Sequence, residues 1–165
     1  MPSVGRQAAR RALQYLQAPG GFSDNLAALM QLEGVVLPDV GMRQYSEEFA
    51  GQDLIDRSAG ARYPAVHVYC EKYVNTLREK FRTFSGKAHL AVEVRVSQDR
   101  VEGLGAALQI YVDAVARVLA QQRGDWGNGM FYGGGYEAVF GAVKHGGRNF
   151  VQSGKVLFEV EVSLD

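Results

Sequence analysis

The first residues in this sequence that suit phosphate chemistry are two Gly-Lys pairs, at 86–87 and 154–155. A P-loop needs a serine or threonine after the lysine, a second glycine five residues earlier, and a helix N-terminus that faces the phosphate. Neither pair has these neighbours, and each leads into a strand-like alternation, so we predict a glycine bend at the start of a strand. The run from Gly103 to Leu108 fails as a dinucleotide fingerprint, because it lacks the final small residue and follows no strand directly.

Candidate nucleophiles and acid–base groups lack partners in the sequence. Cys70 falls on the apolar face of a predicted strand, where a cysteine is usually a small core residue, and nothing beside it supplies a base. No Gly-x-Ser-x-Gly elbow surrounds Ser85 or Ser153. We interpret the acidic pairs at 47–48 and 53–56 as an exposed loop. The sequence therefore predicts no catalytic residue.

Metal and cofactor binding have equally little support. The histidines are His67, His89 and His145, and no two of them stand at ligand spacing. We expect His67 and His89 to face solvent or a partner, opposite the valines of their strands. The single cysteine excludes a disulfide framework within the chain and a zinc site made of cysteines alone. We predict no metal and no cofactor.

Length and charge limit the class of protein. The chain has 165 residues, which suits one domain over 1–165, and 18 basic residues balance 18 acidic ones. A neutral chain does not coat nucleic acid through bulk charge, since that needs a basic excess. No apolar run approaches the roughly 20 residues that span a bilayer, and no secretory signal follows the first arginines. We expect a protein without membrane contact.

Hydrophobic periodicity predicts the elements that carry these residues. Spacing of about 3.6 residues predicts helices over 3–17, with Ser3 as N-cap, over 23–34, and over 101–121. Alternation predicts strands over 65–70, 88–97, 136–143 and 149–163, while 71–84 is ambiguous between strand and helix. Residues 35–62 form an irregular excursion, with a short strand at 35–37 and a helical turn at 53–57.

This order of elements predicts the fold class. Helices cannot cross over between every pair of strands, which favours an antiparallel arrangement. We expect an α+β fold, a mainly antiparallel sheet of about four strands with helices packed on one face. Val92, Val94 and Val96 would face those helices, and Glu93, Arg95 and Ser97 the other side.

The most unusual composition lies in residues 124–147, which hold nine of the 20 glycines with aromatic residues between them. One interpretation is a hairpin with glycines at bulges and aromatics in the core. Another is a protein–protein surface, because aromatic side chains supply large contact areas and glycines let backbones approach closely. Stacking on single-stranded nucleic acid is disfavoured, since only Lys144 and Arg148 bring positive charge.

The carboxy-terminal part resembles a known family. The long helix contains YVDAV (111–115) and precedes the glycine- and tyrosine-rich hairpin, after which comes KHGGRNFVQSGKV (144–156). Upstream lie YPAVHV (63–68) and HLAVEVRV (89–96). Over residues 60–165 this order resembles the tail terminator, or tail completion, proteins of long-tailed bacteriophages and prophages. The excursion at 35–62 has no counterpart in the resemblance.

The resemblance implies a structural assembly protein without a cofactor. Members of the family are α+β proteins that form a hexameric ring of identical subunits, which caps the tail tube protein, ends tail polymerisation and offers a surface to the head-side connector protein. DNA passes through the lumen without sequence-specific binding. The expected location is the head-proximal end of the virion tail, after assembly in the host cytoplasm.

We predict that six residues lie at or beside a subunit or tube contact: Tyr132, Tyr136, Lys144, Arg148, Asn149 and Phe150. A cyclic ring joins two different patches of each subunit, and open strand edges can pair between subunits. The alternatives are a head–tail connector or neck protein, a nucleic-acid-binding module that uses the Gly/Tyr stretch and the arginines of residues 6–11, and a small hydrolase.

Overall fold

The computed structural model describes residues 3–47 and 62–165. Within these residues the helices are α1 (Val4–Gln17), α2 (Phe22–Glu33) and α4 (Leu104–Gln121), with a short 3-10 helix η1 (Met42–Gln44). The strands are β1 (Tyr45–Ser46), β2 (Ala65–Asn75), β3 (Phe84–Gln98), β4 (Gly124–Gly127), β5 (Met130–Tyr132), β6 (Glu137–Phe140), β7 (Lys144–Gly146) and β8 (Asn149–Leu164).

All of these strands belong to one mixed sheet in the order β1-β2-β3-β8-β5-β4, with β6 and β7 also paired to β8. The α+β class is confirmed, but the prediction of about four antiparallel strands is wrong. The described sheet has eight strands, and β1 pairs with β2 in parallel. The number is larger because the glycines of 124–147 break that segment into four short strands, where the sequence predicted one strand at 136–143.

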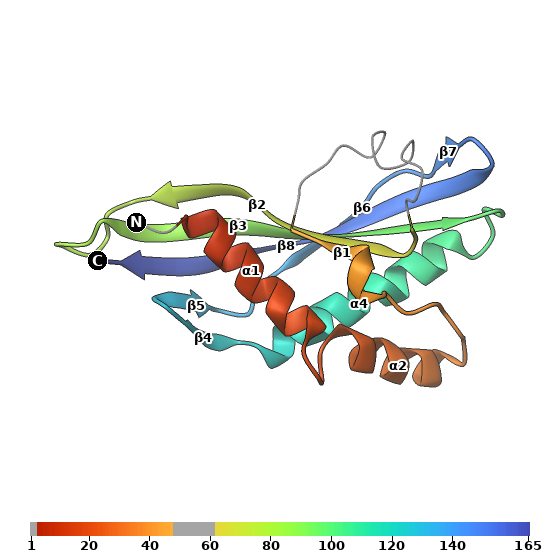
Figure 1. Cartoon of the computed structure of the whole chain (residues 1–165), viewed down its shortest axis with the longest axis horizontal. Coiled ribbons are helices and arrows are strands. Elements are labelled where there is room, and N and C mark those ends of the chain that lie inside the picture. The colour runs from red at the N-terminus through yellow and green to blue at the C-terminus, as the bar shows by residue number, and fades with distance from the viewer. Residues whose placement is uncertain (1–2, 48–61) are drawn as a thin grey trace.

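Helices and the apolar face of the sheet form the core. β3 and β8 pair along their whole lengths, from Phe84 opposite Leu164 to Gln98 opposite Phe150. Most even-numbered residues of both strands, such as Val92 and Val156, are buried beneath α1 and α4. Figure 1 shows the three helices on the same side of the sheet. The predicted inward alternation is therefore confirmed for both strands.

The helix ends follow partly from the sequence. Gly34 ends α2 in the left-handed conformation, with φ of 69°, which glycine adopts without steric cost. Ser3 occupies the N-cap position of α1, but its side chain makes no capping hydrogen bond. A reciprocal pair of amide hydrogen bonds between Asn25 and Gln121, at 3.1 and 3.2 Å, joins α2 to the end of α4.

The two Gly-Lys pairs do not begin strands. Gly86 and Gly154 lie inside β3 and β8, where neighbouring atoms leave no room for a larger residue. A Cβ on Gly86 would lie 1.8 Å from the carbonyl oxygen of Val74 in β2, and one on Gly154 would lie 3.0 Å from Val112 in α4. The predicted bends are thus wrong, and both glycines serve close packing.

The excursion differs from its prediction where it is described. Residues 35–37 form no strand, and the local structure that follows is η1 and the short strand β1. The Tyr111 hydroxyl holds this segment to α4 by donating a hydrogen bond to the carbonyl of Pro38. The predicted helical turn at 53–57 and most of the acidic pairs lie outside the described residues.

The sheet face opposite the helices carries polar side chains, and several of them are buried. Glu93 and Arg95 face that side as predicted, yet both are almost inaccessible, and Arg95 Nη2 lies 2.6 Å from Glu93 Oε2. Lys155 Nζ lies 3.8 Å from the other carboxylate oxygen, and a buried charge needs such partners. His67 is also buried, so the expectation that it faces solvent is wrong.

Candidate assembly surfaces

An open sheet edge carries the largest group of exposed apolar side chains among the described residues of the sheet. β5, β6 and β7 follow one another along the same side of β8, and no described strand pairs with the outer side of β6. We call this the β6 edge and define it by its exposed apolar residues, Tyr136, Val139, Phe140 and Val143.

The β6 edge lacks the features that protect lone monomers. Natural edge strands are commonly blunted by lysines, prolines or bulges, because their unpaired backbone groups otherwise recruit another strand. The run from Tyr136 to Val143 contains one charged residue, Glu137, and no proline. Its exposed apolar side chains lie on both faces of the sheet beside unpaired backbone groups, and such an edge is a template for pairing with another strand.

The opposite edge of the sheet is also open over part of its length. β1 covers β2 only at Val66 and His67, and no other described strand pairs with that side. Beyond this point β2 bulges at Glu71, between Cys70 and Lys72, and its last five residues are exposed. Tyr73 and Val74 contribute apolar surface there.

A groove of about 860 Å³ runs beside this open part of β2, and we call it the β2 groove. Its wall is the first half of α1, and its floor is the edge of β2 itself. Gly5 brings the helix close, since a Cβ there would lie 3.0 Å from the Cys70 side chain. The lining residues are Ser3, Gly5, Arg6, Ala9, Ser46, Glu47, Tyr69, Cys70, Glu71, Lys72 and Tyr73.

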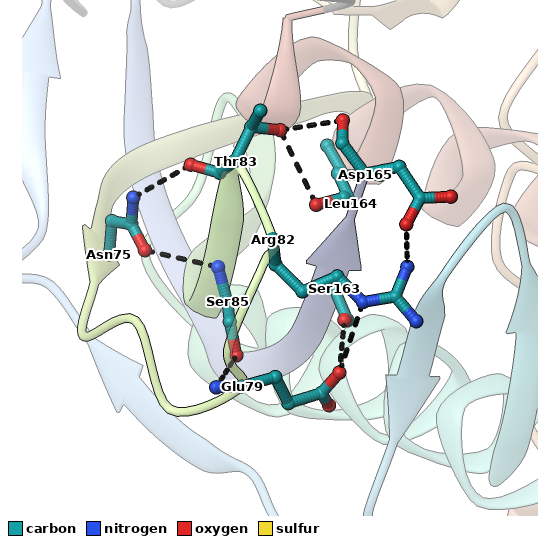
Figure 2. Close-up of polar contacts among 8 residues, drawn as sticks. All are labelled: Asn75, Glu79, Arg82, Thr83, Ser85, Ser163, Leu164 and Asp165. Atoms are coloured by element: carbon teal, nitrogen blue, oxygen red, sulfur yellow. Dashed lines mark hydrogen bonds and ion pairs between the residues drawn. The ribbon is translucent and has the colours of Figure 1, made fainter.

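The loop between β2 and β3 is clamped to the end of β8, as Figure 2 shows. Asn75 accepts a hydrogen bond from the Ser85 amide at 3.0 Å and donates one to the Thr83 carbonyl at 3.1 Å. Thr83 donates in turn to the Asp165 carbonyl at 2.7 Å. These contacts order a loop whose apolar side chains, Leu77 and Phe81, are exposed and so do not pack against the core.

Charged side chains complete this clamp. Arg82 pairs with Asp165 and lies 3.3 Å from Glu79, and the Ser163 hydroxyl donates to Glu79 at 2.9 Å (Figure 2). The Glu79 amide donates to the Ser85 hydroxyl at 3.2 Å. Most of these groups are exposed, so each pair contributes little alone, but together they order the loop.

This ordered loop presents two apolar side chains to solvent. Phe81 is 100% exposed and Leu77 is 60% exposed. Both adopt left-handed backbone conformations, with φ of 66° and 48°, which cost free energy in residues with a Cβ. Strained residues cluster at functional sites, which makes this loop a candidate contact surface.

The other end of the sheet carries the β7–β8 hairpin. Figure 1 shows it at the end opposite the β2–β3 loop. Lys144, Arg148 and Asn149 are exposed, and the Phe150 ring lies edge-on to His145 with centroids 5.0 Å apart. Four of the six residues predicted for a contact therefore gather on one protruding hairpin.

The two predicted tyrosines lie in different surroundings. Tyr136 is exposed on the β6 edge. Tyr132 is buried, with its ring between Trp126 and Phe158 and its hydroxyl donating to the Gly135 carbonyl at 3.1 Å. Burial raises the pKa of Tyr132 to about 12. Its place at or beside an interface stays a prediction.

The surface residues that sequence reasoning missed are Val139, Phe140, Leu77 and Phe81. Val139 and Phe140 stood within a predicted strand, but nothing in their pattern showed that its outer side lacks a partner. Leu77 and Phe81 lay in the segment that was ambiguous between strand and helix. The signal available was local, since two apolar residues stand among Arg78, Lys80 and Arg82 in a short polar stretch.

Chemistry-bearing groups do not converge at any of these surfaces. No three His, Cys, Asp or Glu side chains in the described part of the chain are placed to hold a metal ion. Lys87 donates to Glu159 at 3.0 Å and lowers the pKa of that carboxyl, with His89 beside it. Burial raises the pKa of the Cys70 thiol. No helix of the described residues is long and apolar enough to cross a membrane.

No protein-family model matches the chain, and no curated protein matches it.

Proposed function

We propose that this chain is a structural assembly protein that forms a ring on a phage tail tube, ends tube polymerisation and joins the head-side connector. The proposal rests on the resemblance of residues 60–165 to tail terminator proteins. The single structural observation that supports it is the pair of open sheet edges, one along β6 and one along the outer half of β2.

The edges suit contacts between copies. They lie on opposite sides of the sheet and carry different residues, so one copy can offer β6 while its neighbour offers β2. Contacts of this heterologous kind generate rings when the rotation between copies closes. Pairing also removes the exposed backbone groups of both edges.

The ends of the sheet suit contacts along the ring axis. The clamped β2–β3 loop with Phe81 lies at one end, and the β7–β8 hairpin with Lys144 and Arg148 lies at the other (Figure 1). If lateral edges join the copies, these two ends point towards the two axial partners, the tail tube and the connector. The balanced net charge suits a lumen through which DNA passes without being held.

A head–tail connector or neck protein is the second candidate, since it would use the same lateral edges and axial ends. The two functions differ in what fails without the protein. A tail terminator limits tube length, whereas a connector only joins completed parts.

Deletion of the gene from the genome that encodes it separates these functions. If the chain is a tail terminator, the deletion should give tubes of uncontrolled length that stay separate from filled heads. Electron microscopy of lysates would show these tubes, and supplying the chain in trans should restore normal particles. Tubes of normal length that fail to join heads would support the connector instead. Normal, complete particles without the gene would refute both.

A further inference from the structure

The β2 groove has the shape of a missing strand position. It continues the line of β1, which pairs with β2 at Val66 and His67 and then stops. Beyond it no strand of the described residues pairs with the edge of β2, and α1 stands over this edge on the helix side at the Gly5–Cys70 contact. A strand laid here would gain backbone hydrogen bonds from β2 and side-chain contacts from α1, which is recognition by strand addition.

The β6 edge has the direction that this position requires. β2 is antiparallel to β3, β3 to β8, and β8 to β6, so β6 runs opposite to β2. A neighbouring copy in the same orientation would therefore bring its β6 antiparallel to β2. The combined sheet would keep its helices on one side.

Side chains match across such a junction. Ala138 and Phe140 pair with Val156 and Gly154 and thus point to the helix side, where a neighbour's groove lies. The Phe140 ring would leave solvent beside Cys70 and Tyr73. On the other face, Glu137 of one copy and Lys72 of the next supply opposite charges.

We propose that the β2 groove of each copy receives strand β6 of the next copy, with Phe140 packed against α1 and Cys70. This inference rests on the proposed ring and names its subunit contact.

The strand registers fix how the copies must be displaced. The residue pairs across β8 and β3 place Val139 at the same height along the sheet as His67. In β2 that position is already paired with β1. The groove is centred on Glu71, so the neighbour must shift along the strands by about four ladder steps, roughly 13 Å. An even number of steps keeps helix-side residues opposite one another and sets Phe140 level with Cys70. Over a repeat of four strands, roughly 19 Å wide, this gives strands tilted by about 35°, at the lower end of the tilt usual in closed barrels.

Cys70 allows a direct test, because it is the only cysteine in the chain and lines the groove. We would introduce one cysteine on β6, as Ala138→Cys or Phe140→Cys, and oxidise at mildly alkaline pH. Both sites face the helix side, and a disulfide needs Cα atoms within roughly 7 Å. We expect at least one variant to give covalent chains of subunits on a non-reducing gel.

Val139→Cys is the matched control. Val139 and Phe140 are adjacent and each 43% exposed, but Val139 faces the opposite side of the sheet. It should link several-fold less to Cys70 than the helix-side variants do. Adding Cys70→Ser to each linking variant should abolish the product.

Four results would overturn the inference. Links that survive Cys70→Ser would show that β6 meets β6. Equal linking by Val139→Cys would show contact without a defined register. Rings that assemble without any link to Cys70 would leave the proposed function standing and remove this contact, whereas a chain that forms neither rings nor links would refute both.

Hydrogen exchange on the unmodified protein covers the case in which a cysteine variant fails to fold. Amides in residues 70–75 and 137–140 should exchange at least tenfold more slowly in the assembled form than in dilute subunits. Unchanged exchange in either segment would contradict the pairing.

Discussion

Substitution of Gly86 tests the register that builds the β2 groove. In Gly86→Ala the new methyl group would lie 1.8 Å from the Val74 carbonyl oxygen, far inside van der Waals contact. The nearest atoms belong to the backbone of β2, so no side chain can rotate away. The strands must separate locally, which disturbs the groove as well as the ladder.

The expected loss in the free energy of unfolding is about 3 kcal/mol. Overpacking costs about 1–3 kcal/mol, and the rigid backbone neighbour places this site at the upper end. Each ladder hydrogen bond that is lost adds about 1 kcal/mol. Urea titration with Trp126 fluorescence measures this, because the only tryptophan is buried among Tyr15, Tyr132 and Phe158 and senses unfolding.

Gly133→Ala is the control, since nothing lies within 4 Å of a Cβ at that position. Its stability should stay within about 0.5 kcal/mol of the unmodified protein. A Gly86→Ala variant that matches this control would refute the β2–β3 register and, with it, the placement of Tyr73 and Val74 at an open edge.

Three further predictions concern the helices and the β2–β3 loop. Asn25→Ala should lower the free energy of unfolding by about 1–3 kcal/mol in urea titration, because it leaves Gln121 without its reciprocal amide partner. Burial, and secondly the charge of Glu33, raises the pKa of Asp113. The folded state therefore binds the carboxyl proton of Asp113 more tightly than the unfolded state does, and the protein loses stability as the pH rises through the titration of this carboxyl. Asp113→Asn should remove that part of the pH dependence of the thermal unfolding temperature. Phe81→Asn should keep or raise the free energy of unfolding, since asparagine tolerates φ of 66°. The variant should still form the ring but should bind tail tubes more weakly in co-sedimentation. Unchanged tube binding would show that Phe81 is not part of the axial contact.

Local pattern predicted much of the fold. The helices begin and end within a few residues of their predicted bounds, and the alternation of 149–163 specified both the length and the inward face of β8. These segments succeed because one face is buried along the whole element, so periodicity carries the signal.

Sequence periodicity gave no clear prediction where the backbone departs from a regular strand. The bulge at Glu71 adds one residue and reverses the alternation of β2, which made 71–84 ambiguous. Three glycines at 133–135 similarly separate buried Tyr132 from exposed Tyr136, so composition did not indicate which tyrosine faces outward. The amide pair of Asn25 and Gln121 had no local signal, because its members lie on different helices.

The candidate surfaces were harder to predict than the fold. The aromatic stretch attracted notice, but an open edge is a property of the whole sheet, defined by which strands are absent beside it. Phe81 is similar, since its exposure depends on the clamp between its loop and the end of β8. These features need the tertiary arrangement before any residue can be assigned to them.

The mass of the purified chain in solution tests the central claim most directly. Light scattering across a wide range of concentrations, with negative-stain images of the same sample, should give a closed ring of several identical subunits with an opening wide enough for duplex DNA. Polar replacement on the open edge, as Phe140→Asp, should reduce the ring to smaller species. A monomer at every concentration, on its own and with tail tubes added, would contradict the account.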